Sequence, residues 1–322
     1  MKKRKLGTLD VSAIGLGCMG FSHAYGTAVD PTESLRMIRK AYDMGYTFFD
    51  TAECYLGTNA DGSESNNEEL VGKALKDIRD KVVIASKFGV KHMGDHLEMD
   101  SRPETIRKSV EGSLKRLGVD TIDLYYQHRI DPKVEPETVA EVMAELIKEG
   151  KIRCWGISET DEQYLRRADK VCHVTAIENR YSMLATWYEN LFPVCEELGI
   201  TYVAFSPLGN GFLTGKYKGS DTFTEGDFRN FMPQYTEEGF AAAKDLLDLM
   251  EQMSQKKGAT MAQLSLAWML SKKPYIIPIP GSRKEERLKE NASAADVELS
   301  KEEVERIDAL LGTLNIPVFG GH

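Results

Sequence analysis

The strongest constraint on the fold is a regular alternation of short apolar segments, rich in β-branched residues, with longer amphipathic segments. This alternation predicts parallel strands that are connected by helices. Three amphipathic segments are followed by Gly45, Gly118 and Gly150, and glycine commonly ends helices. The expected strands span residues 12–16, 47–50, 81–86, 122–127, 153–157, 174–178, 202–206 and 275–278, and the clearest helices span 33–44, 68–77, 103–117 and 136–149.

The number of strand–helix units favours closure of the sheet into a barrel. A (β/α)8 barrel has eight such units and needs roughly 250 residues, and this chain has 322. The same units could also spread as an open sheet, so the count is the deciding feature. No linker rich in proline, glycine or serine divides the chain. We therefore expect an α/β fold with a single domain, residues 1–322, built as one (β/α)8 barrel.

Four stretches depart from the repeating unit. Residues 6–11 ("LGTLDV") predict an N-terminal hairpin that plugs the bottom of the barrel. Residues 209–236 form a loop whose length indicates a functional role. Residues 237–257 and 301–311 predict two extra helices, the second with Ser300 and Glu303 at the spacing of a capping box.

Composition narrows the partners and the compartment. The formal net charge of −9 argues against nucleic acid as a partner. The five cysteines are an odd number without a C-x-x-C pair, a pattern typical of reduced thiols in the cytosol. The basic N-terminus lacks an apolar signal segment, and no apolar stretch approaches the ~20 residues of a membrane span. We therefore expect a cytoplasmic protein without nucleic-acid or membrane partners.

Four polar side chains stand at the ends of successive expected strands, where barrel enzymes place their catalytic residues. Asp50 ends the second strand in "FFDTAECY", and Tyr55 lies just beyond it. Lys87 stands at the tip of the third strand in "VIASKFG", and His128 at the tip of the fourth in "LYYQHR". An acid, a phenol, an ammonium and an imidazole are therefore expected to face one another.

This set suits the reduction of a carbonyl group. Hydride transfer to the carbonyl carbon leaves negative charge on oxygen, which must be stabilised and protonated. Tyr55 is the expected proton donor, and the Lys87 ammonium would lower the pKa of its phenol. Asp50 would keep Lys87 charged, and His128 would orient the carbonyl. We therefore expect an oxidoreductase that acts on small aldehydes or ketones.

Six segments in this order resemble the aldo-keto reductase family over essentially the whole chain: "DTAECY", "ASKFG", "LYYQHR", "GISE", "FSPLGNGFLTGK" and "IPIPGSRKEERLKEN". The opening "IGLGCMGFSHAYG" is similar to the general bacterial and plant branch of that family. The resemblance implies a barrel, a nicotinamide cofactor bound without a Rossmann domain, and a catalytic tetrad of Asp50, Tyr55, Lys87 and His128. A family variant with Glu at the His position reduces carbon–carbon double bonds, so His128 implies carbonyl chemistry.

The resemblance also implies which residues contact the cofactor. Ser158 matches the serine that holds the carboxamide, while Glu159, Glu178 and Phe205 stand where the family often has Asn, Gln and Tyr. An ionised Glu178 accepts a hydrogen bond but donates none, whereas Phe205 keeps the stacking surface. The other expected contacts are Ser206, Leu208 and Gly209 at the pyrophosphate, and Gly281, Ser282, Arg283, Arg287, Glu290 and Asn291 at the adenosine end.

The segment "GSRKEERLKEN" favours NADP(H) over NAD(H). It opens a helix, and a helix N-terminus presents free N–H groups to an anion. Arg283 and Arg287 share one helix face, and their guanidinium groups suit the 2′-phosphate that NADP alone carries. The alternative is a helix cap with solvated arginines, paired with Glu285 and Glu286.

Two other patterns predict different chemistry. Residues 15–20 ("GLGCMG") match the Rossmann fingerprint, but "FSHAYGTAVD" separates them from the next helix, so a substrate loop fits better. Lys87 could form a Schiff base, but a cationic lysine beside Asp50 and Tyr55 is a poor amine nucleophile.

A zinc site is a further alternative. His92 and His96 are four residues apart, with Asp95 between them in sequence. Gly94 and the lack of an apolar helical face favour a solvated loop instead. We therefore expect no metal.

Aromatic residues in the predicted top loops indicate an apolar or aromatic substrate, although each alone is more often packing. Phe21, Tyr25 and Phe231 are the expected substrate contacts, and Trp187, Phe228 and Tyr235 lie nearby in the sequence. A cofactor-binding regulatory subunit with slow turnover remains open, because the potassium-channel beta subunits resemble this family and keep the tetrad.

Overall fold

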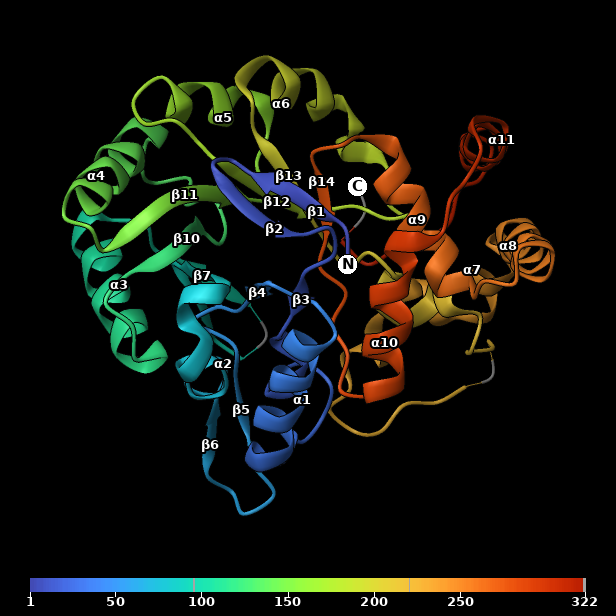
Figure 1. Cartoon of the computed structure of the whole chain (residues 1–322), viewed down its shortest axis with the longest axis horizontal. Helices are drawn as coiled ribbons and strands as arrows, with labels where there is room; N and C mark the ends of the chain where they lie inside the picture. The colour runs from blue at the N-terminus through green and yellow to red at the C-terminus, as the bar shows by residue number, and fades with distance from the viewer. Residues whose placement is uncertain (95, 220, 321–322) are drawn as a thin grey trace.

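The computed structural model describes residues 1–94, 96–219 and 221–320. Within them a parallel sheet of eight strands has the order β14-β13-β12-β11-β10-β7-β4-β3 (Figure 1). The amide of Gly15 donates to the carbonyl oxygen of Pro278 over 2.9 Å, which brings the first and last strands together. The (β/α)8 barrel is therefore confirmed. Its strands are β3 (Leu16–Gly17), β4 (Phe48–Asp50), β7 (Val83–Phe88), β10 (Ile122–Gln127), β11 (Ile152–Ser158), β12 (Ala176–Arg180), β13 (Thr201–Phe205) and β14 (Ile276–Pro278).

Helices surround the strands, as Figure 1 shows. The side chains of Asp30, Asn66 and Asp161 accept hydrogen bonds from the first turns of α1, α2 and α5, which fixes where these helices begin. The helix expected at 103–117 has these same bounds as α3. The ring consists of α1 (Pro31–Asp43), α2 (Asn67–Leu75), α3 (Pro103–Leu117), α4 (Pro136–Lys148), α5 (Glu162–Asp169), α6 (Phe192–Leu198), α9 (Met261–Lys272) and α10 (Glu285–Ser293).

The N-terminal hairpin closes one end of the barrel. Strands β1 (Lys3–Leu6) and β2 (Leu9–Ser12) pair antiparallel across a turn in which Gly7 has a φ of +56°. Leu6 and Val11 are fully buried and pack with barrel residues that include Phe48 and Val203. The predicted plug is confirmed, but Ser12 belongs to the hairpin, and the first barrel strand begins only at Leu16.

The two extra helical regions are also confirmed, with one change. The predicted helix 237–257 is divided at Ala243 into α7 (Glu237–Ala242) and α8 (Lys244–Lys257). Helix α11 (Lys301–Leu311) begins with the expected capping box between Ser300 and Glu303. Helices α8 and α11 pack on each other at the edge of the molecule, outside the ring (Figure 1).

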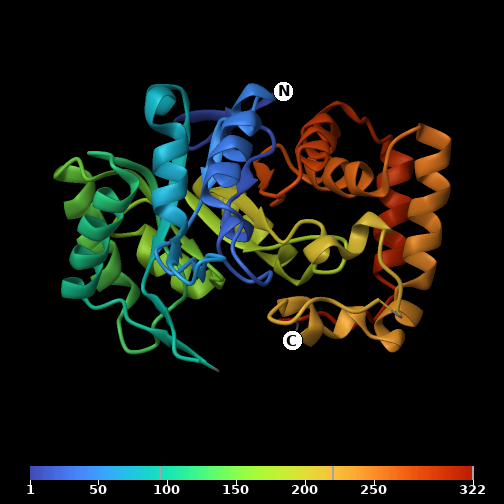
Figure 2. The same cartoon turned by 90° about the horizontal axis from the view of Figure 1, so that it is seen from below.

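The opposite end of the barrel carries irregular segments and short hairpins. Figure 2 shows the N-terminus at one end and the segment after β13 at the other, together with the C-terminal end. Two hairpins were not expected from the sequence: β5 (Leu56–Thr58) with β6 (Glu64–Asn66), and β8 (Val90–His92) with β9 (Leu97–Met99). Short 3-10 turns are η1 (Met19–Phe21), η2 (Lys76–Lys81), η3 (Trp187–Leu191), η4 (Gly209–Thr214), η5 (Phe228–Phe231), η6 (Pro233–Tyr235) and η7 (Ala294–Asp296). None of the helices in the described ranges is long and apolar enough to cross a membrane.

Candidate active site

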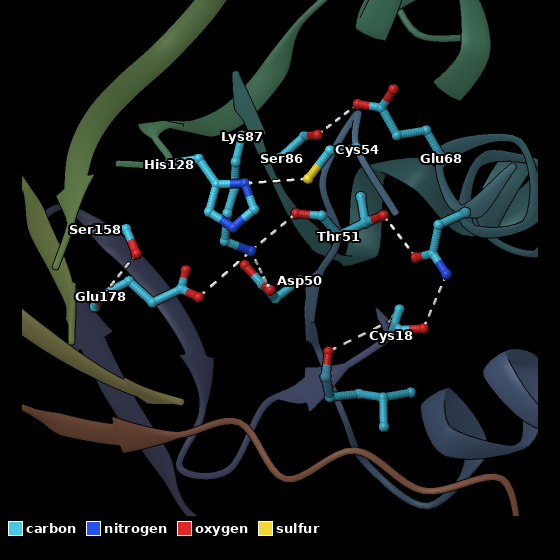
Figure 3. A network of polar contacts seen from close by, with 12 residues as sticks. Cys18, Asp50, Thr51, Cys54, Glu68, Ser86, Lys87, His128, Ser158 and Glu178 are labelled. Atoms are coloured by element: carbon cyan, nitrogen blue, oxygen red, sulfur yellow. Dashed lines mark hydrogen bonds and ion pairs between the residues drawn. The ribbon is translucent and has the colours of Figure 1, made fainter. Parts of the chain in front are cut away.

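Strand register brings Asp50, Lys87 and His128 to one end of the barrel (Figure 3). Asp50 is the last residue of β4 and pairs with Ala85 of β7. Lys87, two residues farther along β7, pairs with Tyr126 of β10, and His128 follows that strand directly. Because the strands are parallel, their carboxyl ends place these side chains together.

The Lys87 ammonium lies at the centre of the site, and its side chain is fully buried. Nζ donates to Asp50 Oδ1 at 2.5 Å and to the carbonyl oxygen of Thr51 at 2.9 Å. It also lies 5.2 Å from the centre of the Tyr55 ring. Burial alone would lower the pKa of Lys87, but the charge of Asp50 and the hydrogen bond that Asp50 accepts outweigh it and raise that pKa. Lys87 is therefore cationic at neutral pH.

Glu178 is a second carboxyl partner of this lysine. Its Oε1 lies 3.4 Å from Lys87 Nζ, on the side facing Asp50 (Figure 3). Burial and the nearby Asp50 charge raise the pKa of Glu178 to about 8, although Lys87 opposes the shift. Glu178 is therefore largely protonated at neutral pH, and a protonated carboxyl donates a hydrogen bond as an amide does. The sequence indicated a changed cofactor contact at this position but not its contact with Lys87.

At neutral pH the Tyr55 hydroxyl is protonated, as a proton donor must be. Burial raises the pKa of its phenol above the ordinary value, while the Lys87 charge acts in the opposite direction. Its ring meets the His128 ring edge-on, with the ring centres 5.7 Å apart. The ring of His23 is stacked beside it, with a centre-to-centre distance of 5.9 Å.

His128 is a neutral imidazole held by a cysteine. Burial, followed by the charges of Arg129 and Lys87, lowers the pKa of His128 well below its usual value. Its Nδ1 lies 3.4 Å from Cys54 Sγ (Figure 3). Burial raises the pKa of Cys54 to about 12, so the sulfur is a thiol. Cys54 stands directly before Tyr55, and this adjacency was the one sequence signal for its role.

The residues expected at the nicotinamide end follow β11, β12 and β13. Ser158 Oγ donates to the carbonyl oxygen of Glu178 over 2.9 Å. Glu159 and Ser206 have left-handed backbones, with φ of +53° and +50°. Asparagine adopts this conformation more readily than glutamate does, which accounts for the Asn that the resemblance implies at position 159. Phe205 is half-buried at the end of β13.

The residues expected at the adenosine end lie around the start of α10. No side chain caps this helix N-terminus. Glu285 pairs with Lys40 and, over 3.4 Å, with Arg36 of α1, and not with the neighbouring arginines. Across the described ranges, Arg283 and Arg287 form no ion pair with a carboxylate. Gly281 lies so close to Gly17 that an added Cβ would be 2.9 Å from the Gly17 carbonyl oxygen. Leu208, Gly209, Ser282, Glu290 and Asn291 complete the expected set.

Comparison with known proteins identifies the family. The sequence profile of the Aldo/keto reductase family matches residues 13–311. The chain belongs to this family. It is 38% identical to "Aldo-keto reductase str7" of Strobilurus tenacellus, over 98% of this chain and 93% of that protein.

Solved structures of aldo/keto reductases have the same fold as this chain. A glycerol dehydrogenase from Gluconobacter oxydans is 28% identical, with a TM-score of 0.85 over 96% of this chain and 95% of that one. An aldo/keto reductase from Klebsiella pneumoniae, solved with NADP and acetate, is 29% identical, with a TM-score of 0.73 over 96% and 95% of the two chains. This aldo/keto reductase is therefore an oxidoreductase whose fold is that of its family.

Two loops of the aldo/keto reductase barrel meet across its open end. Tyr25 forms an antiparallel bridge with Asp227, and its hydroxyl accepts from Asn210 Nδ2 at 3.0 Å. Arg229 lies 5.5 Å from the centre of the Tyr25 ring. A cleft of about 750 Å³ opens beside these loops. It is lined by Ser22, His23, Ala24, Gly26, Thr27, Leu56, Gly57, Thr58, Asn59, Ala60, Thr224, Glu225 and Gly226.

The three residues predicted to contact substrate have different environments. Phe21 is 1% exposed and belongs to the main hydrophobic core. Tyr25 is held by the contacts across the loops, whereas Phe231 is 75% exposed. His23 and Leu56 line the cleft; the His23 ring is stacked beside Tyr55, and Leu56 follows Tyr55 in the chain. The three substrate contacts remain predictions.

The segment with the spacing of a zinc site is a hairpin and not a helix. His92 ends β8, and Asp95 lies outside the described residues. The His92 ring lies 4.7 Å from the His23 ring. No group of three or more His, Cys, Asp and Glu side chains in the described ranges could hold a metal ion.

Proposed function

We propose that this aldo/keto reductase uses NADPH to reduce aldehydes and ketones to alcohols in the cytoplasm, with Tyr55 as the proton donor. The environment of Lys87 supports this proposal most. Lys87 is cationic and buried, its Nζ lies 5.2 Å from the centre of the Tyr55 ring, and the nearby His128 is neutral. These are the states that an acid, its electrostatic partner and a neutral hydrogen-bond donor need for carbonyl reduction.

The chain fits a nicotinamide cofactor at this site. The protonated carboxyl of Glu178 shares a hydrogen bond with Asp50, so it faces the site as a neutral group. At the other end of the proposed site, α10 begins without a side-chain cap, which leaves its first N–H groups free for a phosphate. Ser158, Glu159, Glu178 and Phe205 would hold the nicotinamide end, and Ser206, Leu208 and Gly209 would approach the pyrophosphate.

When bound, the nicotinamide supplies the hydride that reduces the carbonyl carbon. His128 donates a hydrogen bond to the carbonyl oxygen and holds it near Tyr55. The Tyr55 hydroxyl gives its proton to that oxygen, which completes the alcohol and leaves a phenolate. Lys87 stabilises the phenolate by its charge, and Asp50 keeps Lys87 in place.

We also propose that NADPH is preferred to NADH. The uncapped start of α10 and the guanidinium groups of Arg283 and Arg287 suit a phosphate monoester. The neighbouring carboxylate Glu285 is occupied by Arg36 and Lys40, so within the described ranges neither arginine has a carboxylate partner, although Arg283 Nη2 donates to the carbonyl oxygen of Tyr25 at 3.2 Å. The Klebsiella relative was solved with NADP, which supports the same choice here.

The test measures the oxidation of NADPH with a panel of aldehydes, ketones and quinones. The near-ultraviolet absorbance of NADPH reports its consumption. We expect turnover of several aldehydes at rates typical of enzymes, roughly 1–10³ per second for good substrates. Tight NADPH binding without turnover of any panel member would instead favour the regulatory-subunit alternative.

A further inference from the structure

Arg180 lies at the edge of the site and forms no ion pair with a side chain in the described part of the chain. It ends β12 two residues after Glu178, so both side chains lie on the same face of that strand. Its Nε is buried without a hydrogen-bond partner, and its guanidinium donates to none of the described residues. The group lies 5.0 Å from the centre of the Phe205 ring. Gly320, near the C-terminus, packs against the guanidinium, because an added Cβ there would lie 3.3 Å from Nη2 of Arg180. A buried N–H such as Nε is costly without an acceptor unless a ligand supplies one.

Arg129 places a second guanidinium against the same ring. It follows His128 in the chain and lies 5.9 Å from the centre of Phe205. Its Nη1 donates to the carbonyl oxygen of His128 at 2.6 Å and to Ser158 Oγ at 3.1 Å. Throughout the described ranges it pairs with no carboxylate.

The nearby acids offset only part of the charge of this pair. Burial lowers the pKa of Arg180, and the charge of Glu159 acts in the opposite direction. Glu159 Oε1 accepts from the backbone amide of Arg180 at 3.0 Å, and its Oε2 accepts from the Tyr188 hydroxyl at 3.2 Å. Glu178 faces Lys87 instead. Two guanidinium groups therefore lie beside the Phe205 ring, and Glu159 is the single carboxylate near them. This leaves a local excess of positive charge.

The cofactor does not account for this excess. Its anionic groups are phosphates, which we place at residues 206–209 and at the start of α10. The residues beside Arg129 and Arg180 are those proposed for the nicotinamide end, whose carboxamide is neutral. We therefore assign an anion at this position to the substrate.

We propose that Arg129 and Arg180 form a subsite for a carboxylate carried by the carbonyl substrate, so that the enzyme favours oxo acids over uncharged aldehydes and ketones. This inference rests on the proposed carbonyl reduction. A guanidinium fork binds the two oxygens of a carboxylate in parallel. Because Arg129 adjoins His128, a carboxylate held there would orient the carbonyl beside the residues that reduce it.

The test compares acids with their methyl esters, which have the same carbonyl but no charge. The pairs are phenylglyoxylate, 4-carboxybenzaldehyde and succinic semialdehyde, each against its methyl ester. We expect wild type to prefer at least one acid, and the acid-to-ester ratio of kcat/KM to fall about tenfold to a hundredfold in Arg180→Met and in Arg129→Met, the range for a lost charged hydrogen bond. Arg180→Lys should recover part of the ratio.

The control variant is Arg39→Met, which removes an arginine whose guanidinium lies over Tyr42 in α1. It changes the net charge equally, so its acid-to-ester ratio should equal that of wild type. Equal ratios in wild type and both subsite variants, or equal losses for acids and esters, would overturn the subsite.

A binding measurement separates this inference from the proposed function. Benzoate, which has no reducible carbonyl, is titrated into the NADPH-loaded protein while NADPH fluorescence is recorded. Benzoate should bind wild type at least tenfold more tightly than Arg180→Met, even if no ester is turned over. Turnover of esters without any preference for acids, together with equal benzoate affinity, contradicts the subsite alone. Absence of turnover on every compound contradicts the proposed function, and the benzoate result then still decides the subsite.

Discussion

Cys54 Sγ lies 3.4 Å from Nδ1 of His128, in a site where the cysteine is a thiol and the imidazole is neutral. If the thiol proton is directed at Nδ1, the ring proton must be on Nε2. That tautomer is the one able to donate to a carbonyl oxygen. We therefore expect Cys54 to be a positioning residue that acts through His128.

The first prediction concerns this contact. Cys54→Ala should lower kcat about 2- to 10-fold, the effect of one neutral hydrogen bond, whereas Cys54→Ser should retain most of the rate. Nitrogen NMR of the His128 ring should show Nε2 protonated in wild type and a mixture of tautomers in Cys54→Ala. Unchanged kcat and an unchanged tautomer in Cys54→Ala would assign the residue to packing alone.

The second prediction concerns the acid. Tyr55→Phe should lower kcat by ~10²–10⁴, because it removes the proposed proton source. The Tm and the NADPH affinity should stay close to wild type, because the ring and its contacts remain. Near-full kcat in this variant would falsify the role of Tyr55.

The third prediction separates charge from stability at Lys87. Lys87→Met leaves Asp50 as a buried carboxylate without its cation, so the free energy of unfolding should drop by roughly 3–5 kcal/mol. The double variant Lys87→Met/Asp50→Asn should regain part of that stability but none of the kcat. Denaturant unfolding and steady-state kinetics measure the two effects. If kcat recovers along with stability, Lys87 serves the fold and not the chemistry.

The fourth prediction is a pH dependence of stability from Glu178. Its pKa is raised from 4.5 to about 8 in the folded protein. Between these values the folded state binds more protons than the unfolded state, so the contribution of Glu178 to stability is lost as pH rises from about 5 to 8. The Glu178→Gln side chain cannot ionise. As pH rises from about 5 to 8, the Tm of wild type should therefore fall relative to the Tm of this variant. A constant difference in Tm between pH 5 and pH 8 would contradict the raised pKa.

The fifth prediction is the choice of cofactor. Arg287→Ala should weaken NADPH binding about tenfold to a hundredfold, as expected for a charged contact with a phosphate, and barely change NADH affinity. Lys289→Ala, exposed in the same helix, is the matched control. Fluorescence titration of both cofactors measures the preference. Equal affinity of wild type for NADPH and NADH would refute the phosphate site while leaving the tetrad intact.

Much of the architecture was predictable from local sequence. The period of apolar residues and the glycines after helices located the strands and helices, and α3 begins and ends as expected. The short hairpins were not predicted, because segments of three residues are too short for a periodic pattern. The break at Ala243 was missed for a related reason: the segment from 237 to 257 contains no proline to mark a kink.

The sequence alone determined that Asp50, Lys87 and His128 stand at the ends of neighbouring parallel strands, since strand order and direction follow from the repeating unit. Only the tertiary structure decided that Glu178 contacts Lys87 and that Arg129 and Arg180 approach Phe205. Those contacts join side chains from separate strands after the barrel closes. The protonation of Glu178 is likewise a tertiary property, because the loss of water around its carboxyl, and not its place in the chain, raises the pKa.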